Sequence, residues 1–205
     1  MSSAPNPRLY LASASPRRRE LLSQIGLAHL VLPQQIDESL RVGEQPDRYV
    51  LRLAAAKAGA GWQDQRRELT LPVLAADTSV VCNGQILGKP ATLAEARTML
   101  QLLSGRTHQV LTGIAVGFGE ELQTKVVSTD VSFRALSAAE IDAYWHSGEP
   151  RDKAGAYGIQ GKAALFVERI AGSYSNVVGL PLFETVQLLA GFGITTQELL
   201  QEQAA

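Results

Sequence analysis

Six charged side chains follow short apolar segments of this chain, and their types suit contact with phosphate groups. The cations are Arg17, Arg18, Lys57 and Lys89, and the carboxylates are Glu38 and Asp77. Fixed cations neutralise the non-bridging oxygens of phosphates, while carboxylate oxygens can hold a hard metal ion such as Mg²⁺. A carboxylate can also orient a water for attack on phosphorus. A free aspartate, with a pKa of roughly 3.9, is a weak base near neutral pH and would gain from a metal that acidifies this water.

The two arginines lie where a helix is expected to begin. The apolar segment 9–11 predicts a short strand, Ser15 suits an N-cap, and Pro16 suits the first helical position because its φ is preset. A helix N-terminus is already partly positive, so each cation in the run Arg17 to Arg19 costs roughly 0.3–1 kcal/mol there. Such a run indicates a bound anion, held by backbone N–H groups and guanidinium groups together. A solvated basic turn is the alternative interpretation.

Lys57 falls on the apolar face of the next expected helix. Pro46 begins this helix, which runs to about Ala60 with Val50 and Leu53 on its apolar stripe. Because Lys57 comes four residues after Leu53, its ammonium is expected to face inward. The alternative is a lysine that extends from the edge of the stripe into solvent.

The segment from Leu71 to Ala76 is almost wholly apolar, as is typical of a strand buried on both faces. We expect this strand to end at Asp77 and Thr78, which would place a carboxylate and a hydroxyl where ligands gather in α/β sheets. An ordinary Asp-Thr turn is the alternative. The following Asn83-Gly84 pair predicts a hairpin, and its second arm delivers Lys89.

The remaining pattern predicts an α/β fold with a mixed sheet. Further strands are expected at 29–32, 107–118, 122–135 and 165–167, and further helices after Thr92, after Ser137 and from Pro181. The loop at 152–161 contains three glycines, which indicates a backbone that approaches a neighbour closely or takes positive φ. A second loop of small residues is expected at 172–176.

Composition limits the class of protein. The 205 residues are 45% apolar, which allows a proper core in one large domain or two small lobes. A net charge of −1 gives no basic field for nucleic acid, and no apolar run approaches the roughly 20 residues of a membrane span. The N-terminus lacks the apolar core of a signal peptide, so we expect a cytoplasmic protein with neither nucleic acid nor membrane as partner. The single cysteine, Cys82, excludes an intrachain disulfide.

The sequence also lacks several common catalytic motifs. It contains no P-loop, no Rossmann fingerprint, no HExxH, no CxxC and no GxSxG. The three histidines, His29, His108 and His146, are scattered, so we expect them to be structural or exposed rather than metal ligands.

Five short motifs follow one another along the chain: SASPRR at 13–18, ADT at 76–78, GKP at 88–90, DKAGAYGIQG at 152–161 and SYSNVVGLP at 173–181. In this order they resemble the Maf family of house-cleaning nucleotide pyrophosphatases. The match extends from about residue 8 to residue 193. The departures, Ala14 and Ala75 where many members have glycine, remove no functional group.

This resemblance implies a fold related to that of the inosine triphosphate pyrophosphatases, with an elongated mixed sheet, helices, and two lobes around a deep cleft. A single Maf-like domain would span 1–205, with peripheral tails at 1–7 and 195–205, and would usually form a homodimer. It also implies hydrolysis of a nucleoside triphosphate between the α and β phosphates, with Mg²⁺ or Mn²⁺, giving monophosphate and diphosphate. The loop at 152–161 resembles the branch that acts on dTTP and UTP rather than the branch that acts on 7-methyl-GTP.

The resemblance also implies roles for nine residues. Asp77 would accept the proton of the attacking water, and Arg17, Thr78 and Gln160 would set the choice of substrate. The phosphates would be contacted by Ser13, Arg18, Lys57 and Lys89. Glu38 would join Asp77 in supporting the metal or the triphosphate, although Asp37 beside it could serve equally.

Gln160 suits a pyrimidine because its amide offers a donor and an acceptor to the N3–H and carbonyl groups of uracil or thymine. The alternative is that Gln160 only braces a glycine-rich turn. A different kind of function is a nucleotide-binding regulator of septum formation with little turnover, although a pure binder has no need of a water-orienting carboxylate. RNA binding through the arginine turn is disfavoured, because no aromatic residues flank the basic ones.

Overall fold

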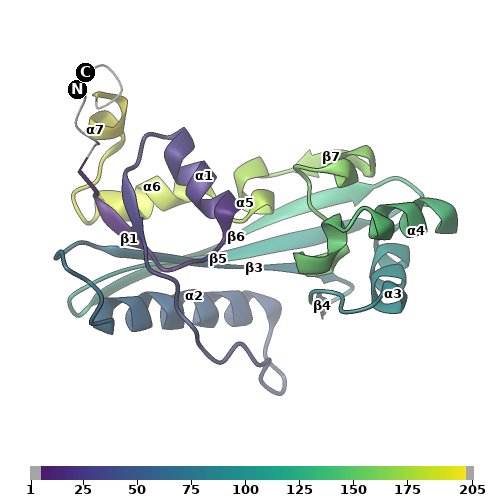
Figure 1. Cartoon of the computed structure of the whole chain (residues 1–205), viewed down its shortest axis with the longest axis horizontal. Helices are drawn as coiled ribbons and strands as arrows, with labels where there is room; N and C mark the ends of the chain where they lie inside the picture. The colour runs from purple at the N-terminus through teal and green to yellow at the C-terminus, as the bar shows by residue number, and fades with distance from the viewer. Residues whose placement is uncertain (1–5, 202–205) are drawn as a thin grey trace.

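A seven-stranded mixed sheet runs along the length of the molecule (Figure 1). The computed structural model describes residues 6–201. The strands are β1 (Leu9–Leu11), β2 (His29–Val31), β3 (Val73–Cys82), β4 (Gln85–Leu87), β5 (Thr107–Phe118), β6 (Glu121–Phe133) and β7 (Val167–Ala171). Their order is β2-β1-β3-β5-β6-β7, with β4 paired to β3 outside this path. β1 is parallel to β2 and β3 and the other pairs are antiparallel, which confirms the mixed sheet expected from the sequence.

Helices cover both faces of this sheet. They are α1 (Pro16–Gln24), α2 (Pro46–Gln63), α3 (Leu93–Leu103), α4 (Ala138–His146), α5 (Tyr174–Val178), α6 (Leu182–Ala190) and α7 (Thr196–Gln201). Figure 1 shows α2 along one face, α1, α5 and α6 on the other, and α3 and α4 at the end near β4. Short 3₁₀ turns at Glu149–Asp152, Ala154–Ala156 and Lys162–Leu165 connect α4 to β7. Among the helices that the structure describes, none has the length and apolar character needed to cross a membrane.

The first half of β3 is buried on both faces, as its apolar sequence predicts. Leu74 and Ala76 pack into the larger core cluster on the side of α1 and α3. Val73 and Ala75 belong to a second cluster on the opposite face, together with Ala58 of α2. The alternation follows from the two-residue period of a strand.

The prediction that this strand stops before Asp77 is wrong. Asp77 and Thr78 lie in the middle of β3, where they pair with Gly113 and Thr112 of β5. The antiparallel partner continues the backbone ladder past the polar residues, so their polarity does not end the strand. These two positions are half-buried while the other eight residues of β3 are buried, so the sheet is open to solvent at this point alone along β3.

The C-terminal region also differs from the sequence prediction. The strand expected at 165–167 lies at Val167–Ala171, because the residues before it form a 3₁₀ turn. The loop expected at 172–176 contains the start of α5, whose N-cap Ser173 accepts a hydrogen bond from the Asn176 N–H. The expected tail at 195–205 includes helix α7, with Leu199 buried. Residues 1–5 and 202–205 of the expected tails lie outside the described residues.

Gly113 of β5 allows α2 to approach the sheet closely. A Cβ atom at this position would collide with the carbonyl group of Val50 in α2. We therefore expect Gly113→Ala to displace the helix that carries Lys57 and to reduce the free energy of unfolding by about 1–3 kcal/mol. Gly59→Ala is the matched control: its Cβ would meet nothing within 4 Å, and alanine favours the helix. Equal urea midpoints for Gly113→Ala and the unsubstituted protein would contradict this account of the packing.

Candidate active site

A cavity of about 660 Å³ opens beside the two half-buried residues of β3. Its walls come from α1, the loop before α2, α2 itself, the β3–β4 hairpin, the glycine-rich loop at 152–161 and α5. Eight of the nine site residues expected from the sequence line it: Arg17, Arg18, Glu38, Lys57, Asp77, Thr78, Lys89 and Gln160. The ninth, Ser13, is buried and contacts Arg18. The structure thus gathers residues that are up to 143 positions apart in the chain, from Arg17 to Gln160.

Lys57 joins the two carboxylates of the cavity. Its Nζ lies 2.8 Å from Oδ1 of Asp77 and 2.6 Å from Oε1 of Glu38. The side chains of Lys57 and Asp77 are 10% and 13% exposed, which confirms that the lysine faces inward. The Glu38 side chain is 54% exposed and therefore lies at the entrance. One ammonium thus holds an inner and an outer carboxylate.

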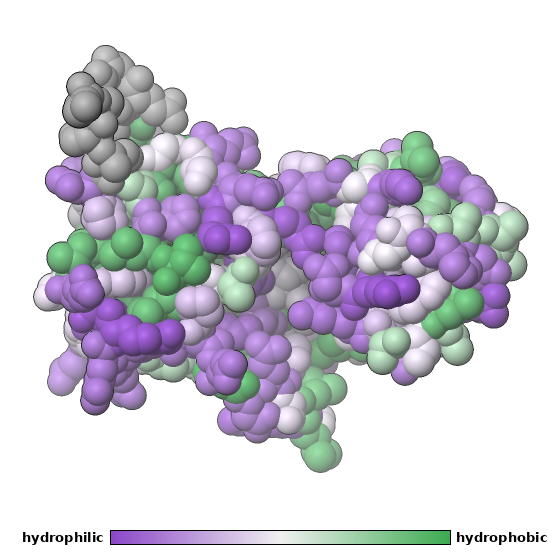
Figure 2. All heavy atoms as spheres, in the orientation of Figure 1, coloured by the Kyte–Doolittle hydropathy of each residue, from purple (hydrophilic) through white to green (hydrophobic). Residues whose placement is uncertain are grey.

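The loop before α2 places Glu38 at this entrance. Tyr49 of α2 donates a hydrogen bond from its hydroxyl to the Glu38 carbonyl at 2.9 Å. The carboxylate of the neighbouring Asp37 accepts from the Ser39 N–H at 2.9 Å and does not line the cavity. Of the two adjacent acids, Glu38 is therefore the one that faces the site. The tip of this loop, which carries the exposed Leu40 and Val42, projects away from the body (Figure 2).

Arg18 is held in one orientation by three segments of the chain. Its Nε donates to the Gly179 carbonyl at 2.8 Å, one terminal nitrogen to Ser13 Oγ at 3.1 Å and the other to Thr78 Oγ1 at 3.2 Å. Burial lowers the pKa of Arg18, and the Asp77 carboxylate opposes this effect. Arginine remains charged in proteins, so the result is a fixed cation in the cavity wall. Ser13 and Thr78 help to hold this cation in place by accepting hydrogen bonds from it.

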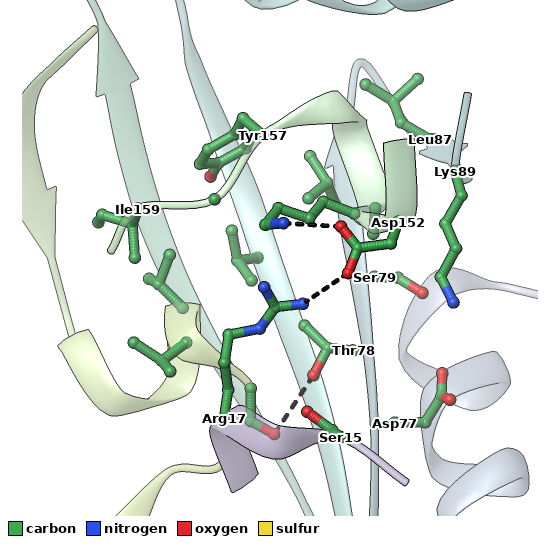
Figure 3. A pocket seen from close by; sticks show the side chains of 18 of the residues that line it. Ser15, Arg17, Asp77, Thr78, Ser79, Leu87, Lys89, Asp152, Tyr157 and Ile159 are labelled. Carbon is green, nitrogen blue, oxygen red and sulfur yellow. Dashed lines mark hydrogen bonds and ion pairs between the residues drawn. The ribbon is translucent and has the colours of Figure 1, made fainter. Parts of the chain in front are cut away.

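Arg17 reaches the cavity from α1, and Lys89 reaches it from the segment after β4. Nη2 of Arg17 lies 3.9 Å from Oδ2 of Asp152, which belongs to the segment after α4. Lys89 follows β4 and is exposed, and Figure 3 shows its ammonium on the same side of the cavity as Asp77. Within residues 6–201 its ammonium forms no ion pair, so Lys89 is available to an anion in the cavity.

The glycine-rich loop needs its glycines, as the sequence predicts. Gly155 has φ +66°, and a Cβ there would lie 2.7 Å from a methyl carbon of Val80. A Cβ at Gly158 would lie 2.5 Å from Cε of Lys153, and one at Gly161 would collide with the Glu149 carboxylate. The close packing holds the loop against the cavity, where Gln160 is exposed between the last two glycines.

The comparisons with known proteins agree with this geometry. The family model described as Maf-like protein matches residues 8–192. The chain belongs to the Maf family. A protein of Chromobacterium violaceum named dTTP/UTP pyrophosphatase is 54% identical over 91% of this chain and 95% of its own. A protein of the same name from Alkalilimnicola ehrlichii is 52% identical over 93% of this chain and 96% of its own.

The solved structures that this Maf chain matches include a HAM1 protein from Coxiella burnetii. That match has a TM-score of 0.43 and 20% sequence identity, and it covers 78% of this chain and 92% of the other.

Two residues that sequence reasoning missed hold the glycine-rich loop of this Maf protein. Tyr144 donates its hydroxyl hydrogen to Oε1 of Glu149 at 2.8 Å and accepts from the Gly158 N–H at 3.2 Å. Oε2 of Glu149 accepts from the Lys162 N–H at 2.9 Å. Both ends of the segment that carries Gln160 are therefore tied to the same pair. The sequence holds no local signal for this pairing, because its partners come from α4 and two separate turns.

His108 of β5 also supports this loop. Its Nε2 lies 2.8 Å from the Tyr157 hydroxyl, and its ring packs edge-on against Phe133 and Tyr157. His108 is 2% exposed, and burial lowers the pKa of its imidazole to about 4. The expectation of a structural rather than a metal-binding role for this histidine agrees with its surroundings.

Because the pKa of His108 is lower in the folded protein than the ordinary value of 6.5, the unfolded chain binds its proton more readily. Between about pH 6.5 and pH 4, acidification should therefore destabilise the fold, by about 1.4 kcal/mol per pH unit from this group. We expect His108→Gln to remove this part of the slope, measured as urea midpoints at several pH values. His146→Gln, at an exposed position, is the matched control and should keep the slope. Identical slopes in both variants would contradict the assignment to His108.

The carboxylates of the site suit a divalent metal that arrives with a phosphate ligand. No group of three or more His, Cys, Asp or Glu residues that could hold a metal occurs in the part of the chain described, residues 6–201. Mg²⁺ is commonly held by one or two carboxylates together with substrate phosphates and waters. Asp77 and Glu38 offer two such carboxylates, both in contact with the Lys57 ammonium. Within the described residues, this ammonium occupies only one oxygen of each carboxylate.

Proposed function

We propose that this protein hydrolyses dTTP and UTP between the α and β phosphates, giving the nucleoside monophosphate and diphosphate. The observation that carries this proposal is the Asp77 carboxylate, paired with Lys57, inside a cavity that other cations also line. The relatives at 52–54% identity, which are named dTTP/UTP pyrophosphatases, support the same substrates.

The triphosphate would be held by three cations of different mobility. Arg18 is fixed by its hydrogen bonds, Lys57 is fixed between two carboxylates, and Lys89 is exposed and free to close on the substrate. Fixed cations cost no reorganisation when the phosphates bind, which favours tight and oriented binding. Ser13 supports phosphate binding through Arg18, whose guanidinium donates to its hydroxyl.

Asp77 would act on the attacking water. Oδ1 accepts from Lys57, which fixes the orientation of the carboxylate and leaves Oδ2 to accept a proton from water. As the water oxygen bonds to the α-phosphorus, the proton passes to Asp77. The bond between the α-phosphorus and the oxygen that bridges it to the β phosphate breaks, and this oxygen leaves with the pyrophosphate. General base catalysis of this kind contributes about 10²–10⁴-fold to a rate.

Asp77 and Glu38 would hold Mg²⁺ or Mn²⁺ together with the phosphates, and because each carboxylate oxygen has two lone pairs, Asp77 can contact the cation and still accept the proton of the water. When bound, such a cation neutralises phosphate charge and lowers the pKa of a coordinated water. Before substrate binds, Lys57 also stabilises the empty cavity, because its ammonium offsets the repulsion between the Asp77 and Glu38 carboxylates.

Gln160 would contact the pyrimidine ring. Its side chain is exposed to the cavity, while the glycines on either side are packed against Lys153 and Glu149. A rigid loop is suited to discrimination, since the amide cannot follow a base of another shape. Thr78 would affect substrate choice through Arg18, because its hydroxyl lies 3.2 Å from that guanidinium and 2.9 Å from the Thr112 hydroxyl.

The test is product analysis with a panel of dTTP, UTP, CTP and 7-methyl-GTP in the presence of Mg²⁺ or Mn²⁺. We expect dTTP and UTP to give dTMP and UMP with pyrophosphate, faster than the other two are cleaved. Release of orthophosphate alone, or no turnover of any triphosphate, would contradict the proposal. Faster cleavage of 7-methyl-GTP would assign the chain to the other branch of the family.

A nucleotide-binding regulator of septum formation is the second candidate. It predicts that dTTP raises the melting temperature without forming product. The inner carboxylate favours the enzyme, because a carboxylate beside the phosphates weakens binding unless it serves the reaction. A homodimer and a cytoplasmic location are further proposals from the family resemblance.

A further inference from the structure

One carboxylate of the cavity has no place in phosphate binding. Asp152 lines the cavity, and its side chain is 70% exposed. Its Oδ1 accepts from Lys153 Nζ at 2.7 Å, and its Oδ2 lies 3.9 Å from Nη2 of Arg17 (Figure 3). Asp77 and Glu38 share the Lys57 ammonium, but Asp152 is not paired with it, and a further carboxylate facing the triphosphate would repel it. We therefore expect Asp152 to contact a different part of the ligand, where its oxygens can accept from a hydrogen-bond donor.

Lys153 is held firmly beside this carboxylate. Its Nζ also donates to the Glu149 carbonyl at 2.8 Å, and its side chain is only 14% exposed. Its methylene groups lie against Gly158, where even a Cβ atom would collide with them. An ammonium has three donors, so one remains for a ligand. The hydrogen bond from Lys153 lowers the pKa of Asp152, so the carboxylate is ionised near neutral pH and can only accept.

We propose that Lys153, Asp152 and Arg17 read the edge of the pyrimidine ring, with Asp152 accepting the N3–H. This inference rests on the proposed function. The three side chains present a donor, an acceptor and a donor in that order. Uracil and thymine present the complement, a carbonyl, an N–H and a carbonyl. Cytosine presents an amino group and an unprotonated N3, which would face the Asp152 carboxylate without a hydrogen.

The arrangement of the cavity fits this assignment. In Figure 3, Tyr157 and Ile159 lie on one side, Asp77 and Lys89 lie on the other, and Asp152 and Arg17 lie between them. A base placed against Ile159 would turn its edge to the central groups while its phosphates extend toward Asp77. Gln160, from the same loop as Ile159, would contact the ring from another direction.

The test compares kcat/KM for dTTP, UTP and CTP in the unsubstituted protein and in Asp152→Asn. We expect the values for dTTP and UTP to fall at least about tenfold, mainly through KM, because a charged acceptor for N3–H is lost. The value for CTP should change less than about threefold, since asparagine can donate to its N3. The control is Asp130→Asn, at an exposed position of β6 outside the cavity, which should change none of the three.

Equal losses for all three nucleotides would overturn the inference, because Asp152 would then act only by orienting Arg17. Unchanged kcat/KM values for dTTP and UTP would overturn it as well. Lys153→Met gives a second test, since it keeps the stem against Gly158 and should raise KM for dTTP with little change in kcat. If the unsubstituted protein cleaves dTTP and the ratios do not move, only this inference fails. If it cleaves no triphosphate, the proposed function fails and this inference fails with it.

Discussion

Asp77→Asn should lower kcat for dTTP by about 10²–10⁴-fold, the range expected when a general base is lost. Asparagine has almost the same shape as aspartate and can still accept a hydrogen bond from Lys57 through its amide oxygen. KM should therefore change much less than kcat, and the melting temperature should change little. The measurement is pyrophosphate release under saturating dTTP.

Asp130→Asn provides the control for the loss of one negative charge, because Asp130 is exposed on β6 and does not line the cavity. It should retain full activity. A fully active Asp77→Asn variant would remove Asp77 from the mechanism, and a variant that has lost its fold would be recognised by its melting curve.

Lys57→Met should affect both stability and turnover. Methionine fills a similar volume on α2, but it leaves the Asp77 carboxylate, 13% exposed, beside Glu38 with no cation between them. Removing one partner of such a pair costs about 1–3 kcal/mol, since the remaining group is left desolvated. We expect the urea midpoint to fall by a corresponding amount, and kcat/KM for dTTP to fall at least about 100-fold because a phosphate contact and the orientation of Asp77 are lost together.

Lys125→Met is the matched control, because Lys125 is exposed on β6 and, among residues 6–201, its ammonium donates a hydrogen bond to Gln187 and forms no ion pair. It should leave both measurements nearly unchanged. Stability equal to that of the unsubstituted protein in Lys57→Met, or a loss of activity no larger than in the control, would contradict the role of Lys57.

Local patterns in the sequence predict much of this site. The apolar stripe of α2 places Lys57 inside, and the structure confirms it. The Asn-Gly pair predicts the β3–β4 hairpin, and both residues take positive φ there, +52° for Asn83 and +76° for Gly84. The glycines of the loop at 152–161 predict close approach, which Gly155 shows against Val80. In each case the signal and its consequence lie within a few residues of each other.

Contacts between distant segments could not be predicted in this way. Asp77 was expected at a strand end, since nothing near it in the sequence shows that Gly113 of β5 continues the ladder. The support of the glycine-rich loop by Tyr144 and Glu149, and of Arg18 by the Gly179 carbonyl, depends on the tertiary fold. Local patterns also do not predict the order of the strands, because it depends on pairing between segments that are distant in the sequence.

Hydrolysis of dTTP in ¹⁸O-labelled water shows whether the water beside Asp77 attacks the α-phosphorus. After a single turnover, mass spectrometry of the two products shows which phosphorus the water attacked. We expect the label in dTMP and none in the pyrophosphate. Label in the pyrophosphate, or in orthophosphate released from the γ position, would rule out attack on the α-phosphorus.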